Sequence, residues 1–79
     1  MRIKLNGDPY DLAESVTVSE LLARLGIDGR RVAVELNLVI LKRGLFEQTM
    51  IEEGDEVEIV NFVGGGSGDS RSHVAMKRQ

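Results

Sequence analysis

One short helix with strong signals at both ends limits the folds that this chain can adopt. Residues 16–26 read VTVSELLARLG, in which Thr17 and Glu20 have the spacing of a capping box. Gly26 is placed to end the helix in a left-handed turn. A helix of about eight residues is too short to persist alone in water, so its apolar face must be buried against a sheet. That face comprises Val18, Leu21, Leu22 and Leu25.

The other regular segments alternate between polar and apolar residues, which is typical of strands with one buried face. We expect strands over residues 2–6, 10–12, 31–36, 39–41 and 56–63. Asn6 and Gly7 favour a hairpin turn between the first two strands, and Asn37 permits a turn between the next two. Residues 45–53 show no clean period. We expect their apolar side chains to close one end of the core: Leu45, Phe46, Met50 and Ile51.

Composition indicates one small domain that is stabilised by packing alone. A chain of 79 residues leaves little room for a large pocket, and the absence of cysteine excludes disulfides and thiolate nucleophiles. Residues 1–66 are acidic and residues 67–79 are basic. An acidic domain is repelled by phosphate backbones, which argues against nucleic acid and favours a basic protein partner, although a charge that only aids solubility is an equally good interpretation. No apolar run approaches a membrane span, so we expect a cytoplasmic protein with no membrane partner.

The last predicted strand has two different faces. Val57 and Ile59 share one face, and Val60 and Phe62 share the other. If the first pair faces the helix, the second forms an apolar pair on the outer face, which suits docking to a partner. Burial of Phe62 under residues 45–53 is the open alternative. If the first and last strands are neighbours, two basic residues would face two acidic ones across them: Arg2, Lys4, Glu56 and Glu58.

Three glycines follow that strand, and they divide the chain into a domain over residues 1–63, a thread over residues 64–66 and an extension over residues 67–79. Gly64, Gly65 and Gly66 have no side chains to pack, so we expect them to stay mobile. A bare backbone can enter a channel too narrow for other residues, although a linker would use such a segment equally well. The extension shows no core pattern, and we expect it to be disordered.

The order of strand, strand, helix, strand, strand, loop and strand resembles the β-grasp, or ubiquitin-like, fold. This resemblance implies an α+β domain in which a mixed sheet of four to five strands packs on one helix, with a flexible C-terminal tail. Three segments are similar to the sulfur carrier proteins of thiamine biosynthesis. They are residues 16–22 (VTVSELL), 31–37 (RVAVELN) and 54–66 (GDEVEIVNFVGGG), and the resemblance covers residues 1–66.

The resemblance implies a carrier whose last glycine is the reactive group, and not an enzyme. A ThiF-like, E1-like enzyme that uses ATP and Mg would adenylate Gly66, and a persulfide sulfur donor would convert it to a thiocarboxylate. A ThiG-like thiazole synthase would then take the sulfur. Gly64 and Gly65 would form the thread, and the carrier itself would bind no cofactor or metal. The residues expected to contact the partners are Val60, Phe62 and Val63.

Two features depart from the family pattern. Leu38 follows Asn37 where the family often has a glycine. Residues 67–79 block the terminal carboxylate that a carrier must expose, so either a protease removes them, or they are an artificial addition, or the chain keeps the fold only as an interaction module. A sulfur carrier of molybdopterin synthesis, which shares the fold and the terminal chemistry, is a further alternative.

Overall fold

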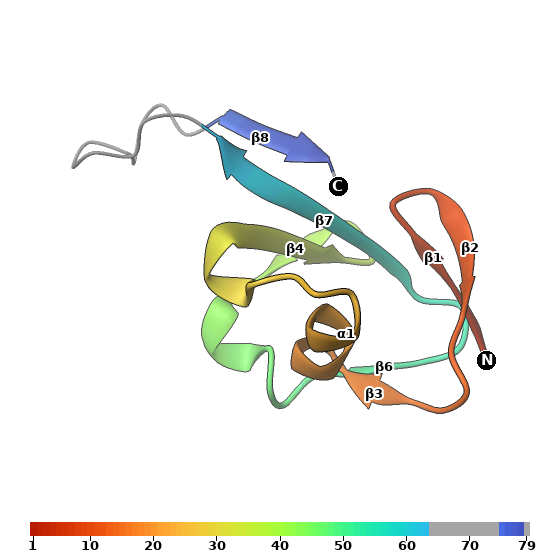
Figure 1. Ribbon diagram of the computed structural model, residues 1–79. Helices are drawn as coiled ribbons and strands as arrows, with labels where there is room; N and C mark the ends of the chain where they lie inside the picture. Colours follow the sequence, from red (N-terminus) through yellow and green to blue (C-terminus); the bar gives the residue numbers. More distant parts are fainter. Residues whose placement is uncertain (64–74, 79) are drawn as a thin grey trace.

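A computed structural model describes residues 1–63 and 75–78, in which a mixed sheet packs against one helix (Figure 1). The main sheet has the strand order β2-β1-β7-β4-β5, and a further strand, β8, pairs with β7. The strands are β1 (Arg2–Leu5), β2 (Asp8–Asp11), β4 (Val32–Leu36), β5 (Val39–Leu41), β7 (Glu56–Val63) and β8 (Ala75–Arg78). The expected mixed sheet on one helix is thereby confirmed.

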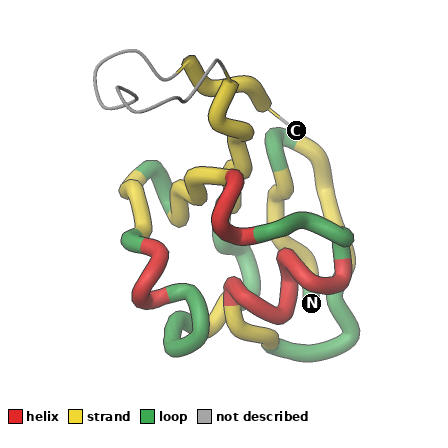
Figure 2. Tube along the Cα trace, turned by 60° about the vertical axis from the view of Figure 1, so that its left-hand side comes forward, coloured by secondary structure: helices red, strands yellow, loops and turns green. Residues whose placement is uncertain are grey.

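Strand β7 lies in the middle of this sheet and organises it. It pairs in parallel with β1, where Leu5 lies opposite Val57, and antiparallel with β4, where Val34 lies opposite Ile59. The first strand of the domain and its last are therefore neighbours in the sheet. Figure 2 shows the arrangement of strands and helices from a second direction. Val57 and Ile59, in the middle of the sheet, are accordingly apolar and almost fully buried.

The helix α1 (Val18–Arg24) covers one face of the sheet, and the alternation in β7 matches that arrangement. Val57 and Ile59 point into the core, and each is only 1% exposed. A short second sheet of β3 (Val16–Thr17) and β6 (Met50–Ile51) lies next to the helix, and two single 3-10 turns, η1 (Gly29–Arg31) and η2 (Arg43–Leu45), flank β4 and β5. The buried core residues are Ile3, Leu12, Val16, Val18, Leu21, Leu22, Val32, Val34, Phe46, Ile51, Val57 and Ile59.

The helix starts at the predicted capping box. The hydroxyl of Thr17 accepts a hydrogen bond from the Glu20 backbone N–H at 3.0 Å, and the Glu20 carboxylate accepts one from the Thr17 N–H at 2.8 Å. Two further donors of the first turn are satisfied by carbonyls of the loop before β6, because Val18 N donates to Thr49 O and Ser19 N to Phe46 O, both at 3.0 Å. The helix N-terminus is therefore tied to the loop that closes the core.

Some details of the predicted elements are wrong. The second strand begins at Asp8 rather than at residue 10, and it forms an edge of the sheet, where a proline at its second position is tolerated. In the loop before β7, Phe46 and Ile51 are buried as expected. Leu45 and Met50 do not close the core, because they are 42% and 43% exposed. Met50 and Ile51 are consecutive residues of β6, so they must point to opposite sides.

The hairpin between β4 and β5 turns through two residues with positive φ, Asn37 at 53° and Leu38 at 71°. Two positive φ angles define a type I′ turn, in which Asn-Gly is the favoured pair. Leu38 thus occupies a position that suits glycine, and its side chain is 75% exposed. Strand β5 adds Val39 and Ile40, each 67% exposed, so this corner of the molecule is unusually apolar.

The C-terminal extension differs from the expected disorder in one part. Residues 75–78 form β8, which pairs antiparallel with the end of β7. Four residues are too few to show an alternating pattern, and the pairing depends on backbone groups rather than on side-chain type, so no sequence signal marked this strand.

The prediction that Gly64, Gly65 and Gly66 form a mobile thread falls on residues outside those that the structure describes. None of the described helices has the length and apolar character needed to cross a membrane.

Candidate partner-binding surface

The far end of β7 extends beyond β1 and β4, and of the described strands β8 alone pairs with its last two residues. Its pairing with β1 covers Glu56 and Val57, and its pairing with β4 ends at Asn61. Phe62 lies beyond both, and its side chain is 44% exposed. The alternative in which Phe62 is buried under residues 45–53 is therefore wrong. Val60 is half-buried, and Val63 ends the strand.

The side of the sheet away from the helix has an apolar part and an acidic part. Across the ladder between β4 and β7, Ala33 lies opposite Val60, and Glu35 lies opposite Glu58. Directly opposite residues of a pair of strands point to the same face. We define the outer face as this set of side chains together with those on either side: Lys4, Ala33, Glu35, Ile40, Glu56, Glu58, Val60 and Phe62. Such a surface suits a partner that offers both apolar and basic groups.

Only one of the two expected charge pairs forms across β1 and β7. Lys4 Nζ lies 3.7 Å from Glu56 Oε2, and both side chains are about half exposed, so the pair contributes little to stability. Arg2 turns instead to its neighbour on β2, and its Nε donates to Asp11 Oδ1 at 2.8 Å. This hydrogen bond, with the charge of Arg2, lowers the pKa of Asp11. The expectation that Arg2 faces the acidic residues of β7 is wrong, because β2 supplies a closer carboxylate.

The side chain of Asn6 completes the pairing of β7 where β1 ends. Its Oδ1 accepts from Ile59 N at 2.7 Å, and its Nδ2 donates to Ile59 O at 3.3 Å. Asn6 itself has φ of 51°, which turns the chain away from β7 into the hairpin. The sequence marked Asn6 only as a turn residue, and no pattern in it could reveal a bond to a residue more than fifty positions away. Beyond Ile59, this side of β7 is available to β8.

A cluster of charged side chains lies at η1, near the same end of β7. Asp28 accepts from the Arg30 guanidinium at 3.1 Å and from the Arg30 backbone N–H at 2.9 Å, and Arg31 Nε lies 3.8 Å from its other oxygen. The hydrogen bonds from Arg30, helped by the charge of Arg31, lower the pKa of Asp28 to about 2. Asp28 also lines a shallow hollow with Gly26, Ile27, Arg31, Val32 and Asn61. The Asp28 carboxylate is thus charged at neutral pH, and it already forms ion pairs with Arg30 and Arg31.

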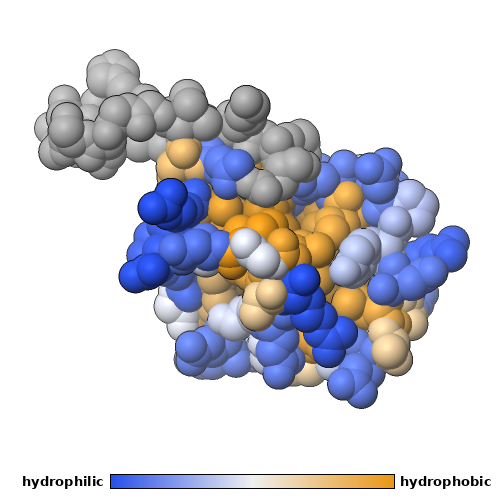
Figure 3. All heavy atoms as spheres, viewed as in Figure 1, coloured by the Kyte–Doolittle hydropathy of each residue, from blue (hydrophilic) through white to orange (hydrophobic). Residues whose placement is uncertain are grey.

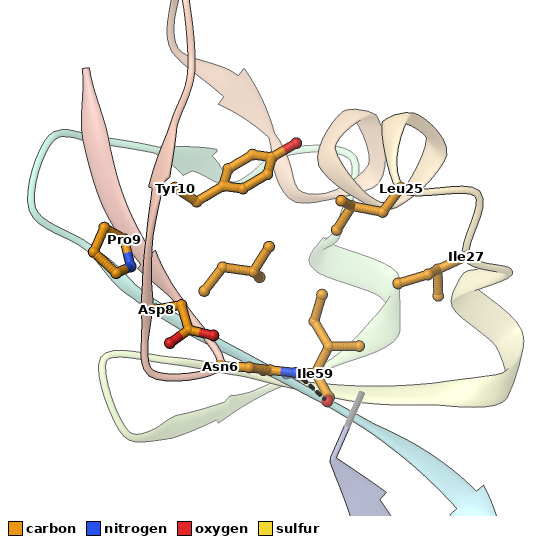
Figure 4. A pocket seen from close by; sticks show the side chains of 8 residues that line it. Asn6, Asp8, Pro9, Tyr10, Leu25, Ile27 and Ile59 are labelled. Carbon is orange, nitrogen blue, oxygen red and sulfur yellow. Dashed lines mark hydrogen bonds between the residues drawn. The ribbon is translucent and has the colours of Figure 1, made fainter.

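A larger hollow lies between the first hairpin and the end of α1, and its volume is about 420 Å³. In Figure 4, Tyr10 of β2 points toward Leu25 and Ile27 across it, and Asn6 is bonded to Ile59 at one side. The remaining lining residues are Leu5, Asp8 and Pro9. On the face shown in Figure 3, hydrophobic side chains gather in the middle and hydrophilic ones surround them. This hollow is larger than the chain length led us to expect, but its lining offers no pair of groups arranged for acid–base or nucleophilic chemistry.

The acidic residues show no arrangement for holding a cation. Within residues 1–63 and 75–78, no group of three or more histidine, aspartate or glutamate side chains is placed to bind a metal ion. Asp55 is instead used in the turn before β7, where it accepts from Asn37 Nδ2 at 3.1 Å and from Glu52 N at 2.8 Å. In the described part of the chain, the acidic residues of this region thus hold a turn together.

A mixed sheet that packs on one helix, with its central strand running out at an exposed end, defines a ubiquitin-like β-grasp domain. The family model described as "ThiS family" matches residues 3–66, which is most of the chain. The chain belongs to the ThiS family.

The solved structures agree with this assignment. The crystal structure of a thiamine biosynthesis protein (ThiS) from Geobacter metallireducens superposes with a TM-score of 0.75 at 42% sequence identity. The match covers 84% of this chain and all of that one. A solution structure of a thiamine biosynthesis protein from the same organism gives a TM-score of 0.70 at 41% identity, over 92% of this chain and 97% of that one.

Curated relatives fall into long and short proteins. A protein named thiazole synthase from Paramagnetospirillum magneticum is 43% identical over 72 residues, which is 91% of this chain but 22% of that protein. The sulfur carrier protein ThiS of Bacillus subtilis is 34% identical over 65 residues, which is 81% of this chain and 98% of that protein. The chain thus spans about a fifth of the length of the thiazole synthases that it matches, and nearly all of the short carrier.

Proposed function

We propose that this chain is a sulfur carrier for thiazole formation in thiamine biosynthesis, and that it acts as a protein cosubstrate in the cytoplasm. The observation that carries the proposal is the extent of the family match, which runs through the exposed end of β7 and stops at residue 66, the last of three glycines. A relative named as a sulfur carrier is matched over almost its whole length. The exposed apolar and acidic outer face supports the proposal, because a carrier has to dock to the enzymes that act on it.

In the proposed reaction, Gly66 bears the reactive carboxylate once residues 67–79 have been removed. A carboxylate is a poor electrophile, so an E1-like, ThiF-like enzyme transfers AMP to it from ATP with Mg, and pyrophosphate leaves. A persulfide sulfur attacks the acyl carbon, AMP leaves, and a thiol cleaves the sulfur–sulfur bond to release the thiocarboxylate. Gly64 and Gly65 form the thread that reaches into the partner's active site, because a backbone without Cβ atoms passes a narrow channel.

We assign the partner contacts to Val60, Phe62 and Val63. Val60 and Phe62 lie on the apolar part of the outer face, and Val63 is the last residue before the thread. The nearby carboxylates of Glu35, Glu56 and Glu58 favour basic groups on the partner. A ThiG-like thiazole synthase is the proposed acceptor of the sulfur, and the similarity of part of two proteins named thiazole synthase supports this choice.

Intact-mass measurement tests the chemistry. A form ending at Gly66 is incubated with a ThiF-like enzyme, ATP, Mg and a persulfide donor. We expect a gain equal to the mass difference between sulfur and oxygen, and no gain in the full chain, whose Gly66 is in an amide bond to Ser67. A form that ends at Gly65 is the matched control. If the form ending at Gly66 stays unmodified, the carrier function is refuted and an interaction module replaces it.

The docking surface has its own test. Phe62→Ser should weaken binding of the form ending at Gly66 to the adenylating enzyme by about tenfold or more, as the loss of an exposed aromatic anchor would. Because the Phe62 side chain is 44% exposed, the free energy of unfolding should change by less than about 0.5 kcal/mol. Leu45→Ser, which changes a residue of similar exposure outside the outer face, is the control and should bind normally.

A further inference from the structure

The end of β7 has one edge that pairs with β4 and another that β1 does not reach. A later segment of the same chain, β8, pairs with this second edge. Val60 and Asn61 pair with β4 on one side and with β8 on the other, so β8 lies on the side where β1 pairs with the earlier part of β7. The register places Ala75 opposite Val63 and Arg78 opposite Val60. The last residue of β8, Arg78, therefore lies next to the point where the pairing of Asn6 with Ile59 stops.

The directions in which the N–H and C=O groups of β7 point show which of its residues can form backbone hydrogen bonds with β8. The carbonyls of Asp55 and Val57 accept from Lys4 and Asn6, and both backbone groups of Ile59 bond to the Asn6 side chain. Odd-numbered residues of β7 thus turn toward β1. Because a strand alternates, Asn61 and Val63 turn their N–H and C=O groups the same way, and these are the groups that meet β8.

We infer that the edge of β7 from Val60 to Val63 is a strand-addition site, and that Ala75–Arg78 of the same chain is its occupant. An unpaired strand edge is a general template for an extended segment, whose main-chain bonds supply the affinity. The register favours this occupant, because each of the four residues of β8 lies opposite a residue of this edge. The Asn6 side chain marks the limit of the site, since it already uses both backbone groups of Ile59.

This site has a consequence that rests on the proposed function. The residues that β8 pairs with include Phe62 and Val63, which are among the proposed partner contacts. A partner that approaches β7 along this edge must displace β8. The extension then acts as an internal competitor of the adenylating enzyme, in addition to blocking the carboxylate of Gly66 covalently.

Amide hydrogen exchange of the full chain, followed by NMR, tests the pairing. The double variant Ala75→Pro/Lys77→Pro removes the two N–H groups of β8 that face β7, whereas Met76→Pro removes one that faces away. We expect the amides of Asn61 and Val63 to exchange about tenfold faster in the double variant, as for the loss of about one net hydrogen bond, and to be unchanged in Met76→Pro. The Val60 amide, which faces β4, is the internal control. Equal exchange of Asn61 and Val63 in all three proteins would overturn the inference.

A second experiment separates this inference from the proposed function. The core residues that the structure describes lie between Ile3 and Ile59, so we expect a form ending at Gly66 to retain the folded domain. A peptide of residues 73–79 added to it should shift the resonances of residues 60–63 and slow adenylation, and the same peptide with both prolines should do neither. If adenylation proceeds and the peptide neither binds nor inhibits, the strand-addition site is refuted and the carrier function stands. If the form ending at Gly66 is never adenylated, the carrier function fails, and the exchange data and peptide shifts still decide the site.

Discussion

The Asn6 side chain bonds to both backbone groups of Ile59, accepting from its N–H at 2.7 Å and donating to its C=O at 3.3 Å. A side chain thereby continues a ladder that the backbone of β1 has left. Two such bonds contribute about 1 to 3 kcal/mol together, because a net intramolecular hydrogen bond is worth about 0.5 to 1.5 kcal/mol.

Replacing Asn6 by glycine tests this bond separately from the backbone conformation. Glycine tolerates the φ of 51° at this position, so Asn6→Gly removes the amide without forcing the turn to change. We expect urea denaturation to show a loss of about 1 to 3 kcal/mol. The Ile59 amide should exchange faster with solvent, while that of Glu58, which faces β4, should not. An unchanged midpoint and unchanged exchange at Ile59 would show that the amide contributes nothing.

Leu38→Gly should stabilise the domain. The leucine has φ of 71°, and a residue with a side chain pays about 1 to 2 kcal/mol in this region. Glycine has a larger entropy in the unfolded chain, which offsets this benefit by about 0.5 to 1 kcal/mol. The free energy of unfolding should therefore rise by a net amount of about 0.5 to 1 kcal/mol. The control is Val39→Gly in the adjoining strand, which should destabilise. Thermal and urea unfolding measure both, and a less stable Leu38→Gly protein would contradict this account of the turn.

Thr17→Ala should destabilise the domain by about 1 kcal/mol, because it removes the hydroxyl that caps the Glu20 N–H. Thr17→Ser keeps the hydroxyl and should lose only a small part of that stability. The comparison of the two variants by chemical denaturation isolates the cap from the packing of the Thr17 methyl group. Equal losses in both would mean that the methyl group, and not the cap, is responsible.

The Asp28 carboxyl should titrate at about pH 2. Its folded pKa lies below the unfolded value of about 3.9, so its contribution to stability is complete above that pH and is lost as the pH falls toward the folded pKa. Side-chain carbon chemical shifts recorded against pH measure this directly. Arg30→Gln should raise the pKa of Asp28, whereas Arg24→Gln, on the exposed surface of α1, should leave it unchanged. A normal pKa in the original protein would show that Arg30 does not hold Asp28.

The parts of the fold that the sequence predicted are those with a repeated or local signal. The capping box needs only Thr17 and Glu20, and the alternation of Val57 and Ile59 extends over a long strand, so both were found. The two-residue strands β3 and β6 escaped, because two residues cannot show a period, and Met50 was therefore assigned to the core. The start of β2 was missed since Pro9 argues against a strand unless an edge is already known.

The candidate surface was predictable only in part, for a similar reason. The period of β7 alone placed Val60 and Phe62 on one face, because strand alternation is local. Ala33 and Ile40 joined them only through the register of β4, β5 and β7, which no single segment encodes. The bond from Asn6 and the pairing of β8 also depend on contacts between distant parts of the chain. The exposed Leu38 could have been suspected, since the sequence has leucine where a turn after Asn37 prefers glycine.

The central position of β7 has a consequence for how the domain folds. Its neighbours β1 and β4 come from the start and the middle of the chain, yet β7 is the last strand of the domain to be synthesised. Until residues 56–61 have left the ribosome, the hairpin of β1 and β2 and the hairpin of β4 and β5 have no strand to join them. The chain between β1 and β7 must lose conformational entropy before the parallel pairing of these two strands can contribute any stabilising free energy. We therefore expect docking of β7, and not formation of α1, to limit the folding rate.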